Sequence, residues 1–171
     1  FQFCKINQPD VSSGFTIDDN ARALITVAMH YELTKDKNDL KLMGIYLNFI
    51  RFCLQSGGNF LNYVDIDKNF TAQNHDVNLD DANGRTVWAL GFLISKKAIL
   101  PDELIATATT IFEKTLPHIE TIHSTRALAF IIKGLYFFNK VSISTENVLL
   151  SERFADRLVN MYQFESAKNW E

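Results

Sequence analysis

Three segments of the chain are apolar on almost every side of a helix, and all three open in the same way. Each starts with a polar residue and an arginine and then continues nearly without polar side chains, as in "DNARALITVAM", "NGRTVWALGFLI" and "STRALAFIIKGLYFF". A helix that is apolar all round is typical of a protein interior. The matching positions of Arg22, Arg85 and Arg126 indicate a repeated unit. We therefore predict three buried helices that belong to one repeat.

The segments between them have one apolar and one polar face. Leu40, Met43 and Leu47 recur at helical spacing, with Lys41 and Asn48 on the opposite side. Helical periodicity predicts helices over 17–33, 37–56, 81–97, 101–116, 122–139 and 144–163. Successive helices pair as αα-hairpins, so that outer helices sheathe an inner ring. Because 171 residues suit one domain, we expect a single all-α domain, or a fragment of one, over residues 1–171.

One connection, over residues 57–79, shows little helical pattern. Connections of that length are usually functional or disordered. The aromatic residues Phe60, Tyr63 and Phe70 argue against complete disorder. We expect a short hairpin that lies over one mouth of the ring, with Phe60 and Tyr63 better placed to gate a cleft than to fill a core.

Composition and motifs exclude several classes of function. The net charge of −3, with scattered lysines and arginines, offers no basic surface for nucleic acid. The apolar stretch from Thr86 to Ser95 is too short to cross a bilayer. Cys4 and Cys53 lack a CxxC partner, as expected for reduced, packed thiols of a cytoplasmic protein. We expect no metal and no cofactor, since the sequence has no zinc-ligand spacing, glycine-rich phosphate loop or nucleophile motif.

The start of the first predicted helix combines capping residues with candidate ligand-binding residues. Thr16 and Asp19 have the spacing of a capping box, and the helix dipole stabilises acids in a first turn. Capping accounts for one acid, so either Asp18 or Asp19 contacts a ligand or both are structural. The three arginines have two possible roles as well, as ion pairs between hairpins or as substrate-binding groups. Farther along this helix, we expect His30 to be a hydrogen-bonded interior residue.

Three ordered stretches, "SGFTIDDNARALI", "DDANGRTVWALGFLI" and "STRALAFIIKGL", resemble a bacterial family with the six-hairpin, (α/α)6 toroid fold. This family is glycosyltransferase-associated or glycoside-hydrolase-like. The resemblance implies that the chain supplies three of six hairpins, about half of a ring. A missing C-terminal half, a partner chain or a homodimer would then cover the apolar surface that half a ring exposes.

The resemblance also implies a carbohydrate ligand in a cleft at the N-terminal ends of the inner helices. Glycosidic cleavage uses two carboxyl groups about 5 to 10 Å apart, which suggests Asp18 or Asp19 paired with Asp81. The leading hypothesis is therefore a glycosidase-like region, with a non-catalytic sugar-binding or scaffolding domain linked to a glycosyltransferase as the alternative. The residues expected to bind the sugar are Asn20, Arg22, Tyr63, Arg85, Trp88, His123 and Arg126.

Overall fold

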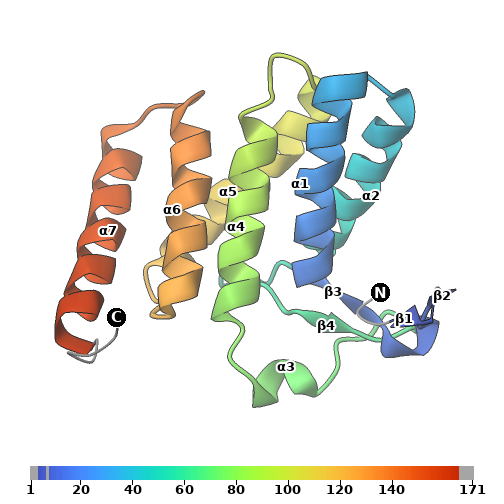
Figure 1. Ribbon diagram of the computed structural model, residues 1–171, viewed down its shortest axis with the longest axis horizontal. Helices are drawn as coiled ribbons and strands as arrows, with labels where there is room; N and C mark the ends of the chain where they lie inside the picture. Colours follow the sequence, from blue (N-terminus) through green and yellow to red (C-terminus); the bar gives the residue numbers. More distant parts are fainter. Residues whose placement is uncertain (1–3, 7, 166–171) are drawn as a thin grey trace.

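The computed structural model describes residues 4–6 and 8–165 and confirms an all-α fold (Figure 1). Each of the predicted helices is present, with its ends within a few residues of the prediction. The long helices are α1 (Ile17–Thr34), α2 (Lys37–Cys53), α4 (Asp80–Ile94), α5 (Asp102–Ile119), α6 (Thr125–Asn139) and α7 (Thr145–Glu165).

Four helix ends lie three residues from the prediction, namely the ends of α2, α4 and α5 and the start of α6. Helix α2 ends at Cys53 because Leu54 turns to extended backbone and forms a bridge with Phe60. Helix α5, predicted to end at residue 116, continues to Ile119. Pro117 falls in the last turn of this helix.

The helices pair as the three predicted hairpins, α1 with α2, α4 with α5 and α6 with α7. Figure 1 shows α1, α4 and α6 side by side in one layer, with α2 and α5 behind it and α7 beside α6. Helix α4 lies in the middle of this layer and packs against both α1 and α6. The N-terminal ends of the three layer helices are all at the lower end of the molecule in this view.

The prediction of three fully buried helices is confirmed for α4 and wrong for α1 and α6. Most of α4 is buried, because neighbouring helices flank it on two sides and α5 covers a third. Helices α1 and α6 each expose one face, where Met29, Leu33 and Tyr136 are open to solvent. The reason is that the outer helices cover a single side of the layer.

Helices α4 and α6 approach until their backbones touch. A Cβ atom on Gly134 would lie 2.6 Å from the carbonyl oxygen of Val87, and one on Gly84 would lie 2.7 Å from that of Ala127. A Cβ on Gly91 would overlap the backbone of Gly134. Only glycine leaves room for this contact.

Short strands flank α1 on its N-terminal side. Strand β1 (Cys4–Lys5) pairs with β2 (Gln8–Pro9), the 3₁₀ turn η1 (Val11–Ser13) follows, and β3 (Phe15–Thr16) pairs antiparallel with β4 (Tyr63–Val64). Of the predicted packed thiols, Cys53 is free and buried, and the side chain of Cys4 lies outside the described part of the chain.

The connection between α2 and α4 is ordered, and it contains the expected short hairpin. Val64 in β4 forms a bridge with Phe70, and helix α3 (Gln73–Asp76) follows as a single turn. Buried asparagine side chains fix this segment to the helices. Asn83 on α4, for example, accepts from the amide of Phe60 at 2.7 Å and donates to its carbonyl at 3.1 Å. Phe60 is fully buried, so its predicted gating role is wrong and it belongs to the core.

Candidate functional site

A polar pocket of about 260 Å³ lies at the N-terminal ends of the three layer helices. Its walls come from the first two turns of α1 and α4, the start of α6 and the loop that carries β4. The lining residues are Asp18, Arg22, Asn62, Tyr63, Asn78, Leu79, Asp81, Ala82, Arg85 and Arg126. The structure thus brings together most of the predicted site residues, and it does so at the predicted end of the helices.

Ion pairs join the helices around this pocket. Asp18 of α1 binds two guanidinium groups, with one carboxylate oxygen on Arg22 and the other on Arg85 of α4. Asp81 of α4 accepts from Arg126 of α6, and its other oxygen accepts from the hydroxyl of Ser124 at 2.8 Å. The predicted ion pairs between successive hairpins are therefore present, linking α1 to α4 and α4 to α6.

The charged groups differ in how far they reach into solvent. The side chains of Arg85 and Asp18 are 15% and 20% exposed, whereas those of Arg22 and Arg126 are 56% and 71% exposed. The guanidinium of Arg85 also lies over the ring of Phe130, 4.7 Å from its centroid. Arg85 and Asp18 therefore form a fixed floor, and Arg22 and Arg126 form a solvent-facing rim.

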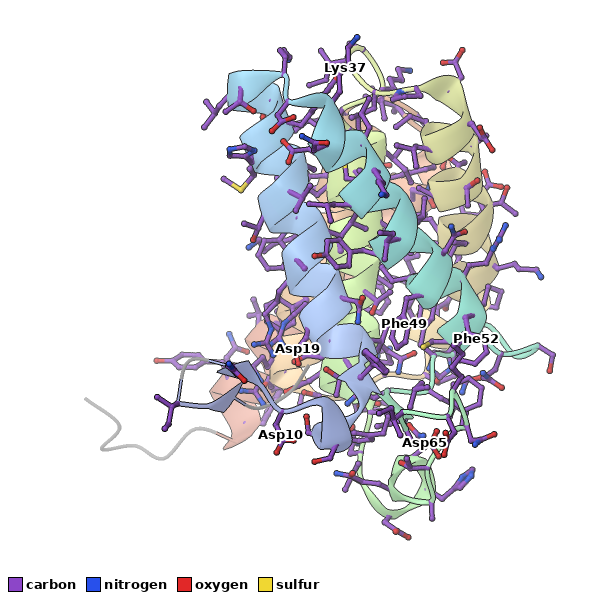
Figure 2. All side chains as sticks on the ribbon, turned by 90° about the vertical axis from the view of Figure 1, so that its right-hand side faces the viewer. Asp10, Asp19, Lys37, Phe49, Phe52 and Asp65 are labelled. Atoms are coloured by element: carbon purple, nitrogen blue, oxygen red, sulfur yellow. The ribbon has the colours of Figure 1, made fainter. Side chains whose placement is uncertain are left out.

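Asp19 and Asn20 face away from this pocket. The Thr16 hydroxyl donates to Asp19 at 2.7 Å and accepts from its amide at 3.3 Å, while the Asn20 amide donates to the Thr16 carbonyl at 2.7 Å. Both residues line a separate groove beside Phe49 of α2, and Figure 2 shows Asp19 and Phe49 on that side of the molecule. Asp19 is thus the capping acid, and Asp18 is the acid in the pocket.

Trp88 and His123 do not line the pocket either. The ring of Trp88 stacks on Phe130 with centroids 5.7 Å apart, and the Lys133 ammonium lies 3.3 Å from its centroid. Burial lowers the pKa of Lys133. A sugar that stacked on Trp88 would have to compete with these neighbours. His123 is exposed, and its backbone amide donates to Asp80 at 3.4 Å.

The pocket also contains two asparagines, Asn62 and Asn78, that are not among the predicted site residues. Asn62 accepts from the amide of Ile17 through its carbonyl, at 3.0 Å, and from the amide of Asp18 through its side chain, at 3.2 Å. Nothing in the sequence indicates this contact, which joins residues far apart in the chain. Asn78 accepts from the Asp80 amide at 2.7 Å, and its position two residues before Asp80 is the signal that could have identified it.

His30, outside the pocket, is hydrogen-bonded as expected but is not an interior residue. Its ring nitrogen Nδ1 lies 2.7 Å from the carboxylate of Asp39, which is buried. The His30 side chain itself is 54% exposed, although it contacts α2.

Chemically, the pocket presents fixed carboxylate acceptors, guanidinium donors and neutral amide groups around an open space. Among residues 4–6 and 8–165, no three His, Cys, Asp or Glu side chains are grouped so that they could hold a metal ion. No helix formed by these residues is both long and apolar enough to cross a membrane. No protein-family model matches the chain, and a search of curated proteins finds none that matches it.

Proposed function

We propose that this pocket binds a carbohydrate and that the chain is a sugar-binding region rather than a hydrolase. One observation carries the proposal: the two acids that line the pocket, Asp18 and Asp81, are both engaged by arginines of the neighbouring helices. Carboxylates held in this way are rigid acceptors, and rigid polar groups around a pocket fix the orientation of a polar ligand. Asn62, Asn78 and Tyr63 add hydrogen-bonding groups at the same opening.

The wider setting that we propose follows the resemblance described above. The three hairpins form about half of an (α/α)6 toroid, in a bacterial cytoplasmic protein linked to a glycosyltransferase. Further hairpins complete the ring, supplied by a C-terminal half, a partner chain or a second copy. The open face of α1 and α6 and the apolar side chains on α2 and α7 support this part of the proposal.

The second candidate function is glycosidic cleavage. It is favoured by the presence of Asp18 and Asp81 in one pocket, on the first turns of adjacent helices. Hydrolysis needs one carboxyl group that donates a proton and a second that attacks or activates water. We rank this function second because arginines engage both carboxylates as hydrogen-bond acceptors.

A binding and turnover experiment separates the two functions. The chain is titrated calorimetrically with a panel of neutral and acidic oligosaccharides, and the same mixtures are analysed for cleavage. We expect binding without cleavage, and a loss of affinity of about tenfold for neutral oligosaccharides in Asp18→Asn and Asp81→Asn, because each change removes a charged acceptor for sugar hydroxyls. Asp156→Asn, an exposed position on α7, is the matched control.

The outcomes are distinct. Binding with cleavage that disappears in Asp18→Asn or Asp81→Asn would establish the glycosidase function. Absence of binding to every saccharide in the panel would overturn the proposal of a carbohydrate site.

A further inference from the structure

We infer that the carbohydrate taken by this pocket is acidic, a saccharide that carries a carboxylate, and that Arg126 and Arg22 bind that group. The inference rests on the proposed carbohydrate function and narrows it to one chemical class of ligand. It starts from the numbers of charged groups that line the pocket, which are three guanidinium groups and two carboxylates.

The guanidinium groups are not fully used by their partners. Asp18 divides its two oxygens between Arg22 and Arg85, so neither arginine has a carboxylate of its own. Asp19 reaches Arg22 only at 3.6 Å, and its other oxygen is held by Thr16. Since each guanidinium has several N–H donors and no acceptor, the pocket has more donors than acceptors. A ligand that supplies acceptors completes it.

The positions of the arginines indicate which of them meet the ligand. Arg85 is fixed between Asp18 and the ring of Phe130 and lies at the floor. Arg126 and Arg22 are the most exposed charged groups at the rim. Exposed ion pairs such as Arg126 with Asp81 contribute little net stability, so an incoming carboxylate can share the guanidinium at small cost. A planar guanidinium matches a carboxylate through two parallel hydrogen bonds.

The neutral groups argue for a sugar acid rather than a simple anion. Asn62, Tyr63 and Asn78 line the same space as the arginines, and such groups pair with hydroxyls. A uronic acid carries both features on one ring, a carboxylate for the rim arginines and hydroxyls for the amide and phenol groups.

The test uses three trisaccharides of similar size: trigalacturonic acid, its fully methyl-esterified form and maltotriose. Binding to the wild-type chain is measured by titration calorimetry at low salt. We expect trigalacturonic acid to bind at least about tenfold more tightly than its methyl ester, because esterification removes the charge and retains the shape. In Arg126→Gln this preference should fall to about twofold, while affinity for the methyl ester changes little. Arg22→Gln should act in the same direction.

Arg153→Gln is the matched control, since Arg153 is also an exposed arginine but contacts Glu120, away from the pocket. Circular dichroism of each variant confirms that it is folded. Equal affinity for the acid and its ester would overturn the inference and leave the carbohydrate function standing. Failure of all three saccharides to bind would count against the carbohydrate function itself. A preference that persists in both pocket variants, or that falls as much in Arg153→Gln, would assign the effect to general charge and overturn the inference.

Discussion

Asn74, a single buried side chain, organises the loop that covers one wall of the pocket. Its oxygen accepts from the amides of Asn62 and Tyr63 at 2.7 and 2.8 Å, and its nitrogen donates to the carbonyls of Tyr63 and Thr71. Asn74→Ala removes the acceptor of the Asn62 and Tyr63 amides, so we expect a loss of about 2 to 4 kcal/mol of unfolding free energy. Urea unfolding followed by circular dichroism measures it.

The control for this prediction is Asn48→Ala, an exposed asparagine on α2. Its effect should stay within about 0.5 kcal/mol. Equal losses in the two variants would show that the loop does not depend on the Asn74 amide.

His118, in the last turn of α5, should make stability depend on pH. Burial lowers its pKa below the usual value of 6.5, and the charge of Asp80 acts in the opposite direction as the smaller cause. The unfolded chain therefore binds a proton before the folded one does, and stability falls as the pH drops through about 6.5 and below. Between about pH 7.5 and pH 5, the wild type should lose more stability than His118→Gln. Chemical unfolding at several pH values across this range measures the slope of unfolding free energy against pH.

His75→Gln serves as the comparison, because His75 is an exposed residue of α3. Its slope should equal that of the wild type. A wild-type slope that is no steeper than that of His118→Gln would refute the role of this burial.

Among the helices, the contact between α4 and α6 should tolerate the least change. Gly91 and Gly134 let the two backbones touch, and a methyl group on Gly91 has no space. We expect Gly91→Ala to destabilise the chain by about 1 to 3 kcal/mol or more through overpacking. Gly44→Ala is the matched control, since a Cβ on Gly44 of α2 meets nothing within 4 Å and alanine favours a helix by up to about 1 kcal/mol. Urea unfolding should therefore show a lower free energy of unfolding for Gly91→Ala and a higher one for Gly44→Ala.

The helices could be predicted from the sequence because their apolar periodicity is local, and the capping contact of Thr16 with Asp19 is local too. The exposure of α1 and α6 could not, since it depends on which side of the layer the outer helices cover.

The loop between α2 and α4 was the least predictable part. Phe60 and Tyr63 lie three residues apart, yet one is in the core and the other lines the pocket. That difference is set by distant partners, Asn83 for Phe60 and Asn74 for Tyr63.

In the candidate site, too, the local features could be predicted and those set by the three-dimensional arrangement could not. The arginines and aspartates were identified because they repeat at the start of each layer helix, and their ion pairs follow from helix adjacency. The sequence could not decide which of Asp18 and Asp19 faces the pocket, because the two differ only by their rotation around α1. The structure resolves this through Thr16, which holds Asp19 beside a separate groove.

At the scale of the whole molecule, the two ends of the hairpin row should bind other copies of the chain through exposed apolar side chains. Ile45 on α2, at one end, is 51% exposed, and Leu149 on α7, at the other end, is 53% exposed. Exposed apolar surface at the open ends of a repeat array normally meets a further unit. We therefore expect this chain, studied alone, to self-associate with increasing concentration. Sedimentation velocity over a concentration series measures the association directly.

Serine substitutions at the two ends test whether these surfaces cause the association. Ile45→Ser and Leu149→Ser should each weaken it, and the double variant should weaken it most, because a contact between the two ends loses apolar surface on both sides. Ile66→Ser removes an equally exposed apolar side chain at the tip of the β4 hairpin and should leave the association unchanged. A chain that stays monomeric at every concentration, or one that responds as strongly to Ile66→Ser, would mean that the ends of the row are not the docking surfaces of a larger ring.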